Sequence, residues 1–122
     1  MRQVLNVFIL LGFIYMGARA TAAWGHAFPD HADPRVGSTV SGSPPEARIW
    51  FDSELEGEFS EIRVENADSV RVDKGDGHVD KSDTKLLEVE LPPLPSGIYR
   101  VFWTAVSRDG HRTEGSFNFT IK

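Results

Sequence analysis

Residues 97–121 read GIYRVFWTAVSRDGHRTEGSFNFTI and carry the clearest structural pattern in the chain. Apolar side chains recur at every second position near both ends of this stretch. A period of two is typical of half-buried antiparallel strands, so the pattern predicts one strand ending near Ser107 and another beginning near Gly115. Asp109-Gly110 lies between them, and this pair is common in hairpin turns. The predicted inward side chains are Tyr99, Val101, Trp103, Ala105, Phe117, Phe119 and Ile121.

Shorter alternating runs occupy much of the preceding sequence, and no helical pattern of any length appears after residue 25. Residues 26–45 are rich in Pro, Gly and Ser, and we expect them to form an extended lead-in. Six or seven short strands in about 100 residues, separated by turn residues, indicate a β-sandwich. The sequence therefore predicts an all-β fold. The shorter runs lie at Ala47–Phe51, Ile62–Val64, Val70–Val72 and Leu87–Leu91.

The first 25 residues have the composition of an export signal. Arg2 precedes an apolar run at Val4–Met16, and small residues follow, including Ala18–Ala20. This is the order of basic, apolar and cleavage regions in a secretory signal peptide. A membrane anchor is the alternative, but the run is short for a bilayer span, which needs about 20 residues. We therefore predict a signal peptide at residues 1–25 and one exported domain at residues 26–122.

The composition of the exported domain limits its partners. Removing the signal leaves 97 residues with 11 basic and 18 acidic side chains, a net charge of −7. An acidic surface disfavours nucleic acid and attracts cations. The chain has no cysteine, so it forms no disulfide and offers no thiolate to a metal. Both methionines, Met1 and Met16, lie in the signal, and the lack of soft sulfur ligands disfavours a Cu(I) site.

His26 would be the N-terminal residue if the signal is cleaved after Gly25. It would then offer two nitrogen atoms, one from the α-amine and one from the imidazole. Asp109 and His111 could add a carboxylate and a second imidazole from the predicted turn. Cu(II) favours tetragonal nitrogen and oxygen ligands, so these three residues form a candidate copper site. Gly110 allows the turn to bend so that both side chains reach the same side, although a plain hairpin turn remains an alternative.

The position of the cleavage site changes this prediction. Cleavage after Gly25 places small residues, Ala23 and Gly25, at the two positions that signal cleavage requires. Cleavage after Ala23 would make His26 the third residue, in a sequence that can chelate Cu(II) or Ni(II) through the amine, two amides and the imidazole. Cleavage after Ala22 would give no such terminal chelate. Two of the three cuts therefore lead to a terminal copper chelate, with different roles for His111.

Other polar residues are weaker candidates. His31 is close enough in sequence to assist the metal, but we favour a surface role or transient metal capture. His78 lies in the polar segment Lys74–Asp83, where it is expected to be solvated. That segment could bind Ca²⁺ through oxygen atoms, but it lacks the full acidic spacing of a calcium loop, which favours an ordinary hairpin.

Taken together, these residues resemble the CopC-like family of periplasmic copper-resistance and copper-carrier proteins. The resemblance covers essentially all of residues 26–122. It implies a seven-stranded Greek-key β-sandwich, immunoglobulin-like or cupredoxin-like, with His26, Asp109 and His111 as the metal ligands. The segments that carry it are His26, Asp33-Pro34, Ile49–Ser53 (IWFDS), Leu94–Ser107 (LPSGIYRVFWTAVS), Asp109–His111 (DGH) and Gly115–Ile121 (GSFNFTI).

The chain also departs from the family pattern. Some members have a further acidic residue near the metal, and that position is Ser53 here, between Asp52 and Glu54. A fourth side-chain ligand is therefore in doubt. Other members carry a methionine-rich loop for Cu(I), which this sequence lacks, so the chain resembles a Cu(II)-only form.

The implied function is non-catalytic binding of one Cu(II) per chain in the periplasm, for copper homeostasis and resistance. The protein would buffer the ion or carry it to an inner-membrane CopD-like copper transporter. It would not bind nucleic acid or span the membrane after processing. Two alternatives remain: an oxidative copper enzyme that uses the N-terminal histidine, and an immunoglobulin-like interaction module without a metal.

Overall fold

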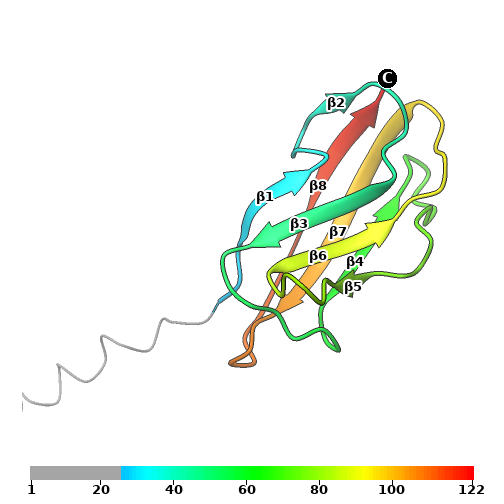
Figure 1. Cartoon of the computed structure of the whole chain (residues 1–122). Coiled ribbons are helices and arrows are strands. Elements are labelled where there is room, and N and C mark those ends of the chain that lie inside the picture. The colour runs from blue at the N-terminus through cyan, green and yellow to red at the C-terminus, as the bar shows by residue number, and fades with distance from the viewer. Residues whose placement is uncertain (1–25) are drawn as a thin grey trace, which may run out of the picture.

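The computed structural model describes residues 26–122, which form a β-sandwich (Figure 1). The predicted signal peptide at residues 1–25 lies outside the described residues. No helix long and apolar enough to cross a membrane occurs within residues 26–122. The strands of this region are β1 (Pro29–Asp33), β2 (Thr39–Val40), β3 (Glu46–Phe51), β4 (Glu61–Glu65), β5 (His78–Val79), β6 (Leu86–Glu90), β7 (Gly97–Val106) and β8 (Arg112–Ile121).

The strands form two four-stranded sheets, in the orders β1-β3-β6-β5 and β2-β8-β7-β4. Figure 1 shows the sheets as two layers, with β1, β3 and β6 in front of β7 and β8. All neighbouring strands are antiparallel except β2 and β8, which are parallel. Most connections cross from one sheet to the other, and the predicted Greek-key sandwich is confirmed.

The number of strand segments differs from the predicted seven. The two-residue β2 lies inside the expected lead-in, where Thr39 and Val40 pair with Thr120 and Ile121 of β8. The two-residue β5 lies inside the expected polar loop and pairs with β6. Such short segments hold too few residues to show an alternating pattern, so only their pairing partners define them.

The hairpin of β7 and β8 is longer than the sequence pattern indicated. Its register runs from Gly97 paired with Ile121 to Val106 paired with Arg112. The second strand therefore begins at Arg112 instead of near Gly115. The reason is that small residues occupy the inward positions there: a Cβ atom on Gly115 would lie 2.7 Å from Cζ2 of Trp103, whose indole fills that space.

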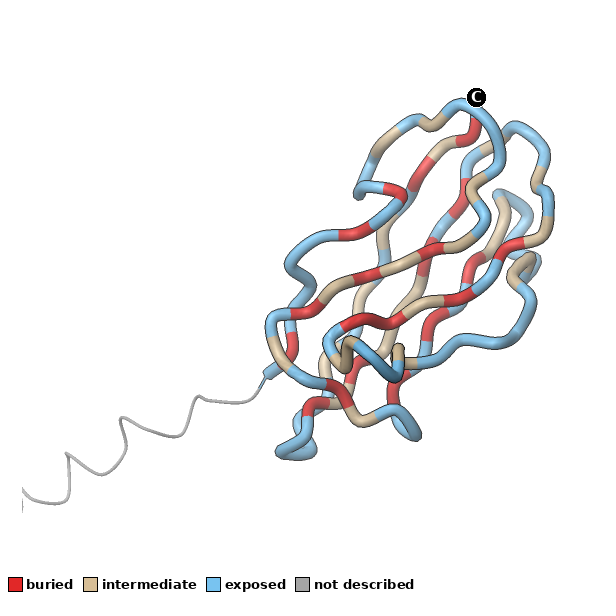
Figure 2. Tube along the Cα trace, in the orientation of Figure 1, coloured by how far each residue is buried: buried red, intermediate tan, exposed pale blue. Residues whose placement is uncertain are grey.

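The core lies between the sheets and contains the predicted inward face of the hairpin (Figure 2). Trp103 and Phe117 are partly buried and pack against the core. Burying side chains of this kind supplies most of the folding free energy of a small domain. The buried hairpin residues are Tyr99, Val101, Ala105, Phe119 and Ile121.

The predicted strand at Val70–Val72 is wrong. This segment makes only an isolated bridge, between Arg71 and Glu65. The side-chain oxygen of Asn66 accepts the backbone N–H of Val70 at 3.0 Å, which closes a tight turn directly after β4. Side chains of this type compete with sheet hydrogen bonds, and Val70 is left 56% exposed.

Candidate metal centre

The turn between β7 and β8 is held by its own polar groups. The N–H of Ser107 donates to the carbonyl of His111 at 2.9 Å, and the N–H of Gly110 donates to the carbonyl of Ser107 at 2.9 Å. Gly110 has a φ of 90°, a left-handed conformation that favours glycine. The hydroxyl of Ser107, which is only 2% exposed, donates to Oδ1 of Asp109. The Asp109 carboxylate therefore has a defined orientation at the end of the hairpin.

Asp109 and His111 contact each other directly. Nδ1 of His111 lies 2.8 Å from Oδ2 of Asp109, and the backbone N–H of His111 donates to Oδ1 at 3.2 Å. The Ser107 hydroxyl and then the His111 ring lower the pKa of Asp109 to about 2, so its carboxylate is charged at any physiological pH. Because Nδ1 faces the carboxylate, Nε2 of His111 is the ring nitrogen left for a metal. A carboxylate in this position can also serve to orient a metal-binding imidazole.

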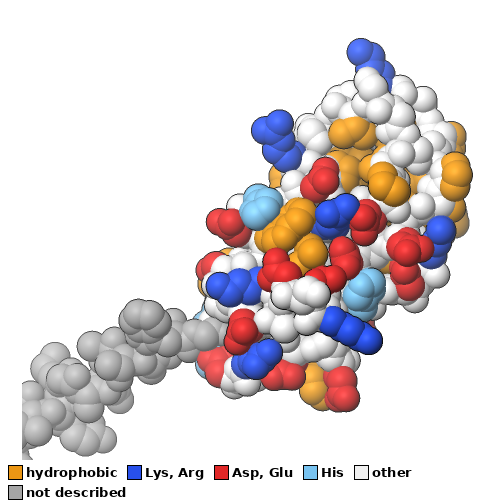
Figure 3. Space-filling model, in the orientation of Figure 1, with side chains coloured by type: hydrophobic (Ala, Val, Ile, Leu, Met, Phe, Trp, Pro, Cys, Tyr) orange, Lys and Arg blue, Asp and Glu red, His pale blue; other side chains and the backbone are white. Residues whose placement is uncertain are grey.

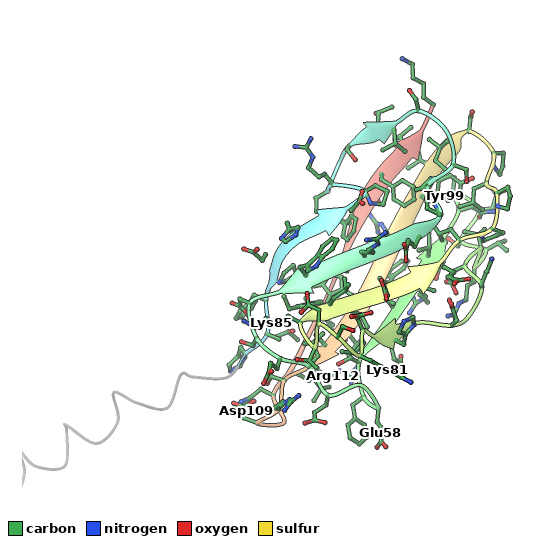
Figure 4. The ribbon with its side chains drawn as sticks, viewed as in Figure 1. Glu58, Lys81, Lys85, Tyr99, Asp109 and Arg112 are labelled. Atoms are coloured by element: carbon green, nitrogen blue, oxygen red, sulfur yellow. The ribbon has the colours of Figure 1, made fainter. Side chains whose placement is uncertain are left out.

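His26 lies against this pair although it is 85 positions from His111 in the sequence. The two imidazole rings stack with their centroids 4.6 Å apart and an interplanar angle of 14°. On the other side, His26 stacks against Phe28 with centroids 6.0 Å apart. The structure thus brings together the three residues that the sequence proposed as metal ligands. Figure 4 shows Asp109 at the end of the sandwich where the described chain begins.

The backbone after His26 is attached to both sheets. Ala27 is fully buried, and its carbonyl accepts the hydroxyl of Thr113 at 2.6 Å. The N–H of Phe28 donates to Oδ1 of Asp52 at 2.8 Å, and the N–H of Asp52 donates to the carbonyl of Phe28 at 2.9 Å. We call residues 26–28 the N-terminal arm. Its attachment to β8 and to the end of β3 explains why His26 lies at the turn.

The side chains of His26 and His111 would have to reorient before they could bind one ion together. The nitrogen lone pairs lie in the ring planes, and the planes of the stacked His26 and His111 rings are nearly parallel, so the two rings do not point at a common centre. Within residues 26–122, no group of three or more His, Cys, Asp or Glu side chains is already arranged to hold a metal. Both histidines are exposed, so no buried packing would have to be broken to turn the His26 ring out of its stack on His111. Imidazole nitrogen and carboxylate oxygen are the ligand types that suit Cu(II).

The acids near Ser53 have other partners. Asp52 binds the N-terminal arm, and it also accepts the Ser53 hydroxyl at 3.3 Å. The carboxylate of Glu54 accepts the hydroxyl of Thr84 at 3.1 Å and lies 3.6 Å from Nε of Arg108. These contacts do not include His26 or His111 and supply no fourth ligand.

The two remaining histidines lie on the outer face of the front sheet. His31 of β1 stacks on Trp50 with centroids 4.5 Å apart, and its Nδ1 is 2.9 Å from Oδ2 of Asp30. Nε2 of His78 lies 3.2 Å from Oε1 of Glu88. The backbone carbonyl of Asp76 and the nearby carboxylates raise the pKa of His78. Neither ring contacts the His26–His111 pair in the structure.

The carboxylates of the predicted polar loop at residues 74–83 accept backbone N–H groups, both from the loop itself and from the residues that follow it. The oxygens of Asp76 accept the N–H of Glu90, those of Asp80 accept two N–H groups, and Asp83 accepts the N–H of Lys85. Carboxylates engaged in this way are less available to a cation. The residues after β5 form the expected hairpin turn to β6, whereas the residues before β5 connect the two sheets. The contacts therefore disfavour a calcium site.

Two residues at the site were not identified from the sequence. Ser107 orients Asp109, and Thr113 holds the N-terminal arm. Ser107 and Asp109 have the spacing of a turn that is closed by side-chain hydrogen bonds, and this spacing could have identified Ser107 from the sequence. Thr113 gave no signal, because its partner lies 86 positions away.

The fold and the site together describe a small Greek-key β-sandwich with two histidines and an aspartate clustered at one end. The family model described as the CopC domain matches residues 30–122. The chain therefore belongs to the CopC family, and the family resemblance drawn from the sequence is confirmed.

Individual relatives agree with this assignment. Copper resistance protein C of Escherichia coli is 30% identical over a 130-residue alignment that covers 98% of this chain and 99% of that protein. Copper transport protein CutJ of Bacillus subtilis is 29% identical over 116 residues, and the match spans 94% of this chain but only 21% of that longer protein. The crystal structure of CopC from Methylosinus trichosporium OB3b superposes with a TM-score of 0.74 at 28% identity, covering 80% of this chain and 94% of that one.

Proposed function

We propose that this protein binds one Cu(II) ion per chain and acts without catalysis, as a copper buffer or carrier. The observation that carries the proposal is the meeting of His26, Asp109 and His111 at one end of the sandwich. His26 would supply its amine and imidazole, His111 its Nε2, and Asp109 either an oxygen ligand or the orientation of the His111 ring.

The choice of Cu(II) rests on the ligands that the domain offers. Residues 26–122 contain no cysteine and no methionine, so nitrogen and oxygen are the available donors. Such ligands favour Cu(II) over Cu(I), and reduction would weaken binding. The net charge of −7 for residues 26–122 also suits a cation as cargo. Figure 3 shows Asp and Glu side chains interspersed with Lys and Arg on one face.

We further propose that residues 1–25 are an export signal and that residues 26–122 work as one domain in the periplasm. The family match over residues 30–122 supports a single domain that lies after the proposed signal. The names of the relatives, a copper resistance protein and a copper transport protein, support a role in copper homeostasis. Delivery to an inner-membrane CopD-like transporter is part of the same proposal.

The test uses the processed protein, isolated after its own signal peptide has directed its export. Its intact mass, with and without one equivalent of Cu(II), reports the cleavage site and the stoichiometry together. We expect a chain that begins at His26 and gains one copper. A chain beginning at Trp24 would move the chelate to the amine, two amides and the His26 imidazole.

The first prediction concerns His111. Replacing it with alanine should weaken Cu(II) binding by orders of magnitude, because the turn loses its only imidazole. Competition with a chelator of known affinity measures the change, and His78→Ala serves as the control histidine. A loss of affinity of less than threefold in His111→Ala would contradict the proposed site. Reductant-dependent peroxide formation by the copper-loaded protein would support the oxidative enzyme instead.

A further inference from the structure

The N-terminal arm is ordered by groups that do not belong to the proposed ligand set. Thr113 of β8 binds the carbonyl one residue after His26, and Asp52 binds the N–H two residues after it. Asp52 also donates its own N–H to the carbonyl of Phe28, so this contact is reciprocal. Between the two attachments, Ala27 is fully buried in the core cluster. Hydrogen bonds at Ala27 and Phe28, together with the burial of Ala27, therefore hold the backbone of the N-terminal arm in one position.

This attachment matters because chain termini are usually poorly ordered unless they are tied down. A terminal residue that must supply two ligand atoms loses its conformational freedom when the metal binds. If folding has already ordered the backbone, less of that loss falls on the binding step, and the affinity rises. The close stack of His26 on His111 shows where the attachments place the terminal residue.

We propose that Thr113 and Asp52 are positioning residues, which hold His26 beside His111 and so set the affinity for Cu(II). The inference rests on the proposed function. It adds how the N-terminal arm, which carries His26, is held against the turn that carries Asp109 and His111. Neither residue is assigned a bond to the metal. The role of Asp52 is to accept the Phe28 N–H. The variants below also test the competing assignment, in which the Asp52 carboxylate binds the metal itself.

Two pairs of variants separate positioning from ligation. Thr113→Val removes the hydroxyl with little change in shape, and Thr113→Ser restores it. Asp52→Ala removes the acceptor, whereas Asp52→Asn keeps an oxygen that can accept the Phe28 N–H but is a poorer metal ligand than a carboxylate. Matched controls are Thr120→Val at the far end of β8 and Glu54→Gln, at an acid two positions after Asp52 that contacts Thr84 and Arg108.

We expect Thr113→Val and Asp52→Ala each to weaken Cu(II) binding about tenfold, which is the effect of losing one hydrogen bond of about 1.4 kcal/mol. Thr113→Ser, Asp52→Asn and both controls should bind within threefold of the unchanged protein. The electron paramagnetic resonance spectrum of the copper-loaded variants should keep the parameters of the parent, because the ligands stay the same. Amide hydrogen exchange at Phe28 in the copper-free protein should accelerate in Asp52→Ala, which confirms that the arm has been released.

The outcomes are distinguishable from failure of the proposed function. If His111→Ala loses copper but Thr113→Val and Asp52→Ala bind like the parent with a released arm, the positioning role is wrong and the site stands. If Asp52→Asn loses affinity and changes the spectrum, Asp52 is a ligand and its positioning role is overturned. If His111→Ala also binds like the parent, the proposed site itself fails.

Discussion

At the scale of single residues, Asp109 is the most strongly determined group at the candidate site. Its carboxylate accepts hydrogen bonds from the hydroxyl of Ser107 and the backbone N–H of His111, and it also contacts the His111 ring. These contacts favour the charged form, which is why the pKa of Asp109 is lowered to about 2. The turn therefore presents a carboxylate that is charged at neutral pH beside the imidazole that we propose as a ligand.

The second prediction concerns Ser107, whose hydroxyl is the largest cause of the low pKa of Asp109. In Ser107→Ala the pKa of Asp109 should rise toward its ordinary value of 3.8. Because the folded-state pKa is depressed, the stabilisation from this carboxylate is present above pH of about 4 and is lost as the pH falls toward 2. Ser107→Ala should lose part of this stabilisation, because the pKa of Asp109 in the folded protein is then closer to its ordinary value. The part that remains should be lost over a narrower pH range.

A titration followed by the carboxyl carbon signal of Asp109 in nuclear magnetic resonance measures this change. Ser60→Ala is the matched control, since Ser60 is also a buried serine at the same end and its Oγ accepts the N–H of Val106 at 3.1 Å. The control should leave the Asp109 midpoint in place. An unchanged midpoint in Ser107→Ala would contradict the role given to the hydroxyl.

At the scale of elements, the β7–β8 hairpin connects the core to the candidate site. Its inward apolar residues form part of the core, and its turn carries Asp109 and His111. The alternation in this hairpin was sufficient to predict both strands. The start of β8 could not be predicted, because Thr113 and Gly115 show no apolar pattern and depend on the Trp103 side chain of the neighbouring strand.

The third prediction tests that dependence. Gly115→Ala places a Cβ atom 2.7 Å from Cζ2 of Trp103, so the indole must move. Overpacking of this kind costs about 1–3 kcal/mol of folding free energy. Urea unfolding followed by tryptophan fluorescence measures the loss. Gly57→Ala is the control, since its Cβ would meet Val79 at an ordinary 3.8 Å. Equal stability of the two variants would argue against the close packing of Trp103.

At the scale of the whole molecule, the site depends on both sheets. The turn belongs to the sheet of β7 and β8, whereas the arm is held partly by Asp52 at the end of β3 in the other sheet. A ligand that connects the two parts should favour the folded state. Binding that is restricted to the native protein stabilises it by mass action.

The fourth prediction follows from this linkage. Free Cu(II) at 100 times its dissociation constant should stabilise the processed protein by about 2.7 kcal/mol. Thermal unfolding with and without copper measures the rise in Tm. His111→Ala and a form with one extra residue before His26 should show a smaller rise, because each loses part of the proposed ligand set. An equal rise in all three proteins would indicate copper binding elsewhere.

The sequence alone determined the two strands of the hairpin apart from the start of β8, the all-β class and the chemical types of the candidate ligands. These properties depend on neighbours in the chain: alternation places side chains on one face, and Asp-Gly-His places a carboxylate and an imidazole on one turn. Only the tertiary structure decided that His26 stacks on His111 and that Asp52 binds backbone. Those contacts join segments far apart in the sequence, through Thr113, Asp52 and the burial of Ala27, and no local pattern encodes them.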